Sequence, residues 1–278
     1  MEEIGVVQDD TNILLKSVEV NLLTDLMERC MQNIKEWIAG NGLILNEDKT
    51  NVIYFKTSRS RQQTPTTVTI DNKEIKTAKQ VKFLGLMLDE HLNWESHIDM
   101  ITGKLNSTWY SMRIIKKYVD IKTIKNVYHA GFESVLRYGV IFWGQSTDVE
   151  RVFRIQKGVL RTILGLNRIC SCRGHFRSNN IMTLCGLYIY ELLIFMFKNS
   201  DLFEDLKTKS LRNENYIYPR HRLTIYEKGC FYTCITVFNA LPAELQQVKY
   251  FRSFKSKIHD FLIRLEPYTI QEYLERRR

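Results

Sequence analysis

Proline and glycine are scarce in this chain of 278 residues, which contains 4 prolines and 13 glycines. So few helix-breaking residues, together with apolar residues that recur at intervals of three and four, predict a mostly helical protein. Intrinsic disorder is excluded as the dominant state, because the chain holds 14 tyrosines, 14 phenylalanines and 4 tryptophans. A hydrophobic share of 44% allows a sizeable core, divided between two or three units.

No hydrophobic run is long enough to cross a membrane. The most apolar segment, LCGLYIYELLIFMF, has 14 residues and contains Glu191, whereas a membrane helix needs about 20. It is predicted to be a buried core helix. No secretory signal opens the chain, so its 6 irregularly spaced cysteines predict reduced thiols rather than a disulfide framework. We therefore expect an intracellular protein of the nucleus or cytoplasm with no membrane partner.

Positive charge is in excess only after the first third of the chain. The formal net charge is +9, with −2 in residues 1–80, +7 in residues 81–200 and +4 in residues 201–278. This distribution favours a polyanion as the partner of the later part. A merely solvated basic surface is the alternative, and the choice between them depends on whether the charges share a face.

The first third alternates short strand patterns with one helix. EIGVV, QDDT and NILLK predict a β-hairpin with its turn at residues 8–11. An apolar stripe over residues 22–38 predicts a helix that ends at Gly40-Asn41-Gly42. Further sheet elements are predicted at residues 52–55, in VTIDNKEI with a bend at Asp71-Asn72, and as one strand over residues 81–89.

Helical spacing dominates after Asp89. One apolar stripe runs from Trp94 to Trp109, and another begins at Ile121. QSTDVE is predicted to open a helix with Thr147 or Asp148 as its cap. In the final third, the sequence predicts the core helix over residues 184–197 and a last pair of helices near residues 231–241 and 251–265. The fold class is therefore α+β, a small antiparallel region followed by a predominantly α-helical remainder.

Two adjacent aspartates, Asp9 and Asp10, stand between apolar stretches near the start. Aspartate favours turns because its side chain bonds nearby backbone amides, and this explains a lone pair of this kind. The functional alternative is a divalent-metal site, since two-metal phosphoryl transfer needs carboxylates held rigidly at a strand turn.

QDDTNIL, LNEDKTNVIYF and VKFLGLMLDEHLNWESHI occur in this order. The series resembles the palm-to-thumb stretch of reverse transcriptases from non-long-terminal-repeat retrotransposons of the jockey-like kind. LRYGVIFWG, RIQKGVLRTILG, SCRGHF, IMTLCGLYIYELLIF, HRL, VFNALP and FKSKIHDFL then resemble the C-terminal region of that family. The resemblance therefore extends over nearly the whole chain.

The resemblance implies roles for particular residues. Asp9 and Asp10 would be the palm ligands of Mg²⁺, and Lys49 would lie near the departing pyrophosphate, where an ammonium stabilises negative charge. Phe83, Leu84 and Gly85 would form the primer grip, where a residue without a side chain lets a nucleic-acid backbone approach. An ordinary buried strand with a bulge is the alternative for these three residues.

The resemblance also implies a domain order. The sequence departs from the family pattern at two points. Residues 1–90 would be a partial palm with the primer-grip strand, residues 91–145 a helical thumb, and residues 146–278 a helical C-terminal domain. Val7-Gln8 replaces the aromatic-Ala pair that precedes the aspartates in the family. The fingers and another palm aspartate would lie upstream of this turn, so we expect a truncated RNA-directed DNA polymerase that is inactive alone.

Two other functions stay open at this point. One is a non-enzymatic nucleic-acid-binding or protein-interaction module derived from a retrotransposon, and the other is a relic with no selected role. An open reading frame that continues upstream through the fingers would favour a fragment of an active element over both.

Basic residues without acidic neighbours form two candidate surfaces. Residues 151–177 contain seven basic residues and no acidic one. Helical spacing places five of these on one side of a predicted helix, namely Arg151, Arg154, Lys157, Arg161 and Arg168. A second cluster on the predicted thumb consists of Arg113, Lys116, Lys117, Lys122 and Lys125. We expect both to contact phosphates of RNA, DNA or an RNA–DNA hybrid without reading sequence, a solvated face being the alternative.

Cys170, Cys172, His175 and Cys185 supply four zinc-type ligands. Their spacing, Cys-x-Cys-x2-His-x9-Cys, differs from the Cys-x2-Cys pairs of structural zinc sites. Cys185 also begins the predicted core helix, where small buried cysteines are ordinary. The spacing therefore does not favour zinc.

Overall fold

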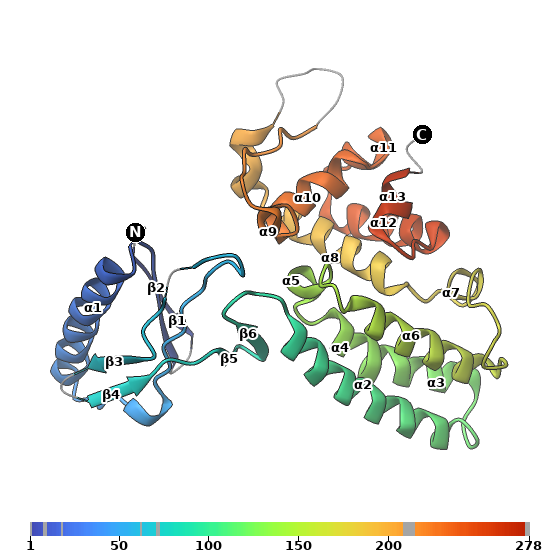
Figure 1. The fold of residues 1–278 in the computed structure, drawn as a ribbon. Helices are drawn as coiled ribbons and strands as arrows, with labels where there is room; N and C mark the ends of the chain where they lie inside the picture. The colour runs from blue at the N-terminus through green and yellow to red at the C-terminus, as the bar shows by residue number, and fades with distance from the viewer. Residues whose placement is uncertain are drawn as a thin grey trace. The chain divides into compact units, whose positions relative to one another are not determined.

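The computed structural model describes residues 2–7, 10–17, 19–61, 63–70, 73–207 and 215–275. The protein is α+β, with short antiparallel strand pairs in the first third and helices in the remainder (Figure 1). This confirms the fold class that the sequence predicts. The chain folds into two compact units, Met1–Asn93 and Trp94–Arg278.

The first unit opens with the predicted hairpin. β1 (Glu2–Val7) pairs antiparallel with β2 (Asp10–Leu15), and Val7 lies opposite Asp10. Residues 8 and 9 of its predicted turn lie outside the described residues. α1 (Val20–Gly40) follows as predicted and ends before Gly42, whose φ of 69° is the left-handed value that glycine adopts readily.

A small core holds α1 against a second hairpin, β3 (Thr67–Ile70) and β4 (Lys73–Lys76). Val68 lies opposite Ile75, so both side chains share one face of the hairpin. That face packs against Met27 and Met31 of α1 (Figure 1). The helix stripe and the strand alternation in the sequence therefore meet in one cluster.

The predicted strand at residues 52–55 does not form. Val52 makes a single parallel bridge with Thr77, and its carbonyl accepts the N–H of Ala78 at 2.8 Å. Further along the stretch, the N–H of Lys56 donates to the carbonyl of Glu90 at 2.9 Å. Because its two ends bond to different segments, this stretch connects β4 to the end of the next hairpin instead of extending a sheet.

The single strand predicted over residues 81–89 is wrong, since two strands lie there. β5 (Gln80–Phe83) and β6 (Leu86–Asp89) pair antiparallel, with Phe83 opposite Leu86. Leu84 and Gly85 form the two-residue connection, with φ values of 44° and 80°. Positive φ at both positions is the geometry that suits the twist of a tight hairpin. An apolar leucine at the tip concealed this turn in the sequence.

The second unit is helical, with a π-helical turn at Tyr128–Glu133 and a 3-10 segment at Ser200–Leu206. Its first α-helices are α2 (Glu95–Ile115), α3 (Ile121–Val127), α4 (Ser134–Arg137), α5 (Val140–Trp143), α6 (Val149–Leu164), α7 (His175–Ser178) and α8 (Leu184–Lys198). The later ones are α9 (Thr224–Glu227), α10 (Cys230–Asn239), α11 (Ala243–Gln246), α12 (Phe251–Leu265) and α13 (Ile270–Glu275). The helices on either side of residue 145 share one hydrophobic core.

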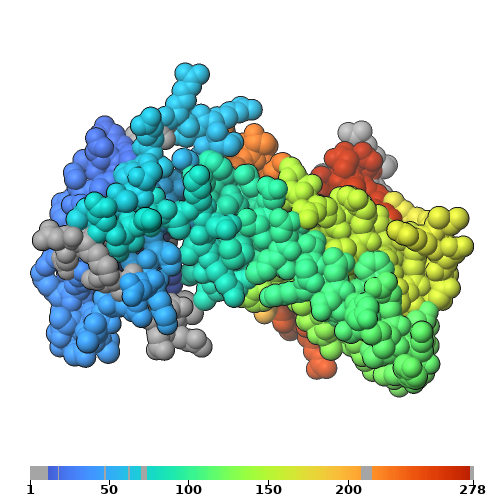
Figure 2. Space-filling model, turned by 60° about the horizontal axis from the view of Figure 1, so that its bottom comes forward, coloured from blue at the N-terminus to red at the C-terminus, as the bar shows by residue number. Residues whose placement is uncertain are grey.

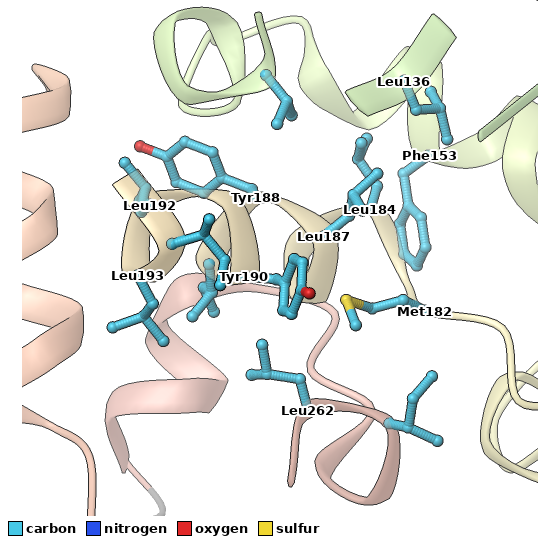
Figure 3. Close-up of a cluster of buried hydrophobic side chains, with 14 of the residues drawn as sticks. Leu136, Phe153, Met182, Leu184, Leu187, Tyr188, Tyr190, Leu192, Leu193 and Leu262 are labelled. Atoms are coloured by element: carbon cyan, nitrogen blue, oxygen red, sulfur yellow. The ribbon is translucent and has the colours of Figure 1, made fainter. Parts of the chain in front are cut away.

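α8 is the central helix of the second unit, as its apolar sequence predicts. Leu187, Tyr188 and Leu193 are buried between helices on both sides of it (Figure 3). Thr183 begins the helix, since its hydroxyl accepts the N–H of Gly186 at 3.0 Å and donates to the carbonyl of Pro267 at 2.6 Å.

A fully buried glutamine ties three parts of this core together. The Gln156 amide donates to the Tyr128 hydroxyl at 2.8 Å and to the Met182 carbonyl at 2.9 Å. Its oxygen accepts the N–H of Leu184 at 2.8 Å. Both ends of a buried amide are thereby satisfied, which removes the penalty for burying it.

Candidate nucleic-acid interface

The structure describes only part of the predicted metal pair. Asp9 lies outside the described residues, and Asp10 is described by its backbone, which pairs with Val7 in the first hairpin. Among the described residues, no three His, Cys, Asp or Glu side chains come close enough to hold a metal ion. The donor set that Mg²⁺ requires is thus not assembled by the side chains that are described.

Lys49 belongs to a turn that Asn46 organises. The N–H of Lys49 donates to the Asn46 side-chain oxygen at 3.3 Å, and the Thr50 hydroxyl donates to the Asn46 carbonyl at 3.0 Å. The Asn51 amide donates to the Lys49 carbonyl at 3.0 Å. This spacing of Asn46, Lys49 and Thr50 therefore fixes a tight backbone turn and leaves the Lys49 side chain exposed.

The predicted primer-grip residues form the tip of the β5–β6 hairpin. Leu84 is 46% exposed and holds a left-handed φ, which costs a residue with a side chain about 1–3 kcal/mol. At the other end of the hairpin, Asp89 accepts the N–H groups of His91 and Asn93 at 3.0 and 3.1 Å. The Asp89 carboxylate therefore caps a turn, while the strained, exposed residue lies at the tip.

In the second unit, α2 and α6 run parallel, as three contacts along their length show. Asp99 pairs with Arg151 at 2.6 Å near the start of both helices. Further along, the Trp109 indole donates to Thr162 at 2.9 Å. Near the C-terminal ends, a Cβ added at Gly165 would lie 3.3 Å from the Lys116 ammonium. The two helices therefore lie side by side along their length, and their C-terminal ends adjoin.

Four of the predicted phosphate-binding cations already have partners in the protein. Arg151 pairs with Asp99, and this hydrogen bond raises the pKa of the guanidinium. Lys157 pairs with Glu150 at 3.2 Å. Arg161 donates to the Cys170 carbonyl at 2.8 Å, and Lys125 to the Asn179 carbonyl at 3.2 Å. These four side chains hold the fold together as well as carrying charge.

The other predicted cations have no carboxylate within ion-pair distance among the described residues. We call this set the α2–α6 surface, and it consists of Arg113, Lys116, Lys117, Lys122, Arg154 and Arg168. Arg113 lies over the rings of Trp109 and Tyr110, 5.3 and 5.6 Å from their centres. The green surface of α2 and α3 adjoins the yellow-green surface of α6 in Figure 2. Arg113, Lys122 and Arg154 therefore lie on neighbouring helices, and Lys116 and Lys117 directly follow α2.

The predicted helical placement of Arg168 is wrong. α6 ends at Leu164, and Gly165 follows with a left-handed φ of 70°. Arg168 consequently lies in the loop beyond the helix, and it is exposed. The apolar Leu166 prolonged the periodic pattern past the glycine that ends the helix.

Helix electrostatics give the α2–α6 surface a structural explanation besides a functional one. Cations at a helix C-terminus are stabilised by the partial negative charge there, by about 0.3–1 kcal/mol each. Arg113 and Lys116 occupy this position on α2. Arg154 lies in the middle of α6 and gains nothing from a helix end. Like Lys122, which lies in the first turn of α3, it is a cation that the helix dipole does not explain.

The cysteine-rich segment is held by protein contacts. The Cys172 thiol is buried and donates to the Lys157 carbonyl at 3.6 Å. Burial raises the pKa of Cys172, and it raises the pKa of Cys185 to about 12. Both thiols are therefore protonated at neutral pH in the protein without a bound metal.

None of the described helices is both long enough and apolar enough to cross a bilayer.

Comparison with known proteins finds a relative from a retrotransposon. The chain is related in sequence to the reverse transcriptases of non-long-terminal-repeat retrotransposons, as its motifs predicted. A "probable RNA-directed DNA polymerase from transposon X-element" of Drosophila melanogaster is 24% identical over 162 residues. The match covers 56% of this chain and 18% of the Drosophila protein. No family model and no solved structure matches the chain.

One group of exposed side chains was not singled out in the sequence. Tyr218, Arg220, Arg222 and Tyr226 occur within YIYPRHRLTIY, and they lie close together in the structure. Basic residues interleaved with aromatics are the signal that points to this group.

Proposed function

We propose that this chain is the nucleic-acid-holding part of a retrotransposon RNA-directed DNA polymerase. The α2–α6 surface would contact the phosphates of an RNA–DNA hybrid or of duplex DNA. The observation that carries this proposal is a set of cations on or next to adjoining helices, all exposed except the half-buried Lys116, without carboxylate partners among the described residues. A surface built only for solubility intersperses both signs of charge.

The proposed contact is independent of sequence. Lysine and arginine side chains at a helix surface reach phosphate oxygens and fix register without reading bases. The later part of α2 and the turn after it support this role, because residues 100–119 contain four basic residues and no acidic one. Small residues such as Gly103 and Ser107 are exposed on the same helix, and they leave room for a close approach of the backbone.

The first unit would contribute the partial palm. Asp9 and Asp10 would take part in binding Mg²⁺, Lys49 would stabilise the departing pyrophosphate, and the tip formed by Phe83, Leu84 and Gly85 would hold the primer end. Residues 91–145 would act as the thumb and residues 146–278 as a C-terminal domain. These assignments follow the resemblance to the family, and the strained tip at Leu84 supports the primer-grip role.

Two-metal phosphoryl transfer needs more carboxylates than one adjacent pair provides. We therefore propose that the 278-residue chain binds nucleic acid without extending it. Incubation with a primed RNA template, deoxynucleotides and Mg²⁺ is expected to give no extension, while the same template–primer binds with steep salt dependence. Extension of the primer would contradict the first part, and binding that ignores salt would contradict the second.

A further inference from the structure

A hollow of about 530 Å³ lies in the second unit. The residues that line it follow α2 and α6 in the sequence and belong to neither helix. Its lining, which we call the tyrosine pocket, consists of Tyr218, Pro219, Arg220, His221, Arg222 and Tyr232. Tyr232 belongs to α10, and the other residues precede α9 (Figure 1). The size suits one or two planar groups of a ligand.

The segment that forms the pocket is fixed on its N-terminal side. Tyr216 is buried, and its N–H donates to the Asn239 side-chain oxygen at 2.8 Å. The Asn239 amide donates in return to the Tyr216 carbonyl at 2.8 Å. Because both bonds end on α10, residue 218 starts from a fixed place beside that helix.

Aromatic rings line the tyrosine pocket, and the Tyr226 ring lies beside them; these rings are packed against one another but only partly buried. Tyr218 and Tyr232 lie with ring centres 5.2 Å apart, and the His221 ring lies 4.9 Å from Tyr232. Tyr226 stacks beside His221 at 5.9 Å. Tyr218 and Tyr226 nevertheless remain 44% and 40% exposed. A large part of each of these side chains is therefore accessible to a ligand.

Charge on the pocket is positive. Arg220 and Arg222 have, among the described residues, no carboxylate within ion-pair distance. The one carboxylate described at the rim, Glu227, accepts from His221 at 2.8 Å, and this hydrogen bond raises the pKa of His221. The carboxylate is thereby paired, and both guanidinium groups stay available to an anion.

We propose that the tyrosine pocket binds single-stranded nucleic acid. Unpaired bases would stack on Tyr218 and Tyr226, while Arg220 and Arg222 would contact the flanking phosphates. Exposed aromatic faces next to cations are what a single strand requires, because every base has a flat face and every link carries a charge. A duplex does not fit this requirement, since its bases are already stacked and paired. The tyrosine pocket would therefore bind single strands, whereas the α2–α6 surface would bind a duplex or hybrid. The proposal for the pocket does not depend on the proposal for the α2–α6 surface.

The test compares strand forms on the full chain. Binding of a fluorescent oligo(dT) of about 12 residues, the matching oligo(rU) and a hairpin DNA duplex is measured for the wild type and for the double variant Tyr218→Ala/Tyr226→Ala. We expect at least about a fivefold loss for the single strands and less than about a twofold change for the duplex. Comparison of oligo(dT) with oligo(rU) shows whether the tyrosine pocket prefers DNA or RNA.

Two further variants complete the test. Tyr218→Phe retains a stacking face and is expected to bind oligo(dT) as the wild type does. Tyr250→Ala removes a tyrosine that is 81% exposed at the start of α12, and it is expected to change nothing. Unchanged single-strand binding by the double variant, or equal losses for duplex and single strands, would overturn the proposal. Loss of duplex binding on changing Arg154 tests the α2–α6 surface separately.

Photocrosslinking tests the proposal on the wild-type chain, so its result does not require the variants to fold. An oligonucleotide of the same length that carries iodouridine is irradiated with the wild-type chain, and the crosslinked peptide is identified by mass spectrometry. We expect crosslinks at Tyr218 or Tyr226. Crosslinks confined to other peptides would overturn the proposal even if the alanine variants failed to fold.

Discussion

The indole of Trp109 lies so close to Gly158 that no side chain fits between them. A Cβ at position 158 would come within 2.5 Å of the ring. The Trp109 N–H donates to Thr162, whose hydroxyl donates to the Gly158 carbonyl at 3.1 Å. One glycine therefore sets the spacing between α2 and α6, and with it the spacing of the cations that both helices carry.

Replacing Gly158 by alanine is expected to lower the free energy of unfolding by about 1–3 kcal/mol, because the ring or the helices must shift. Gly103 is the matched control. It also lies within a helix, but nothing lies within 4 Å of an added Cβ, so alanine there should stabilise by roughly 0.5–1 kcal/mol. Urea unfolding followed by tryptophan fluorescence measures both, and shifts of the same sign would contradict this account of the α2–α6 contact.

Replacing Gln156 by leucine is expected to cost about 2–3 kcal/mol, since the N–H of Leu184 loses its partner in a buried environment. Gln271 is exposed, and leucine there should change stability by less than about 0.5 kcal/mol. Urea midpoints of the two variants provide the comparison. Equal midpoints would mean that the Gln156 network does not support α8.

Acid is expected to destabilise the second unit through His97. Its side chain is 1% exposed, and burial, with a smaller effect of Lys104, lowers its pKa from 6.5 to about 4. The unfolded chain therefore binds a proton between these values and the folded chain does not, so stability falls as pH drops below 6.5, by about 3 kcal/mol at most. His97→Phe should remove this part of the pH dependence. An NMR titration of His97 with a midpoint near 6.5 would contradict the prediction.

Local patterns in the sequence predicted most of the elements. α1 and α2 follow from apolar stripes, α8 follows from a continuous apolar run, and the first two hairpins follow from alternation with turn residues between the strands. The β5–β6 hairpin was missed because Leu84 keeps the apolar pattern through its turn. Residues 52–55 do not form the predicted strand, because the backbone partners of this stretch are two separate segments, which no local pattern reveals.

The candidate site was predictable as a set of charges but not as a surface. Helical spacing predicts both Arg151 and Arg154 as phosphate-binding residues on one side of a helix. In the structure, however, Arg151 pairs with Asp99, which lies 52 positions earlier. Such a partner is fixed by the parallel packing of α2 and α6, and periodicity within one helix contains no information on it. The difference between these two arginines is therefore visible only in the structure.

The most direct measurement is the salt dependence of hybrid binding by Arg154→Gln and Arg151→Gln. Each phosphate contact contributes roughly 0.7–0.9 to the slope of log affinity against log salt. We expect Arg154→Gln to reduce the slope by about one contact and to leave the urea midpoint unchanged. Arg151→Gln should leave the slope nearly unchanged, since its charge already faces Asp99. Equal slopes for the wild type and Arg154→Gln would contradict the assignment of the α2–α6 surface to nucleic acid.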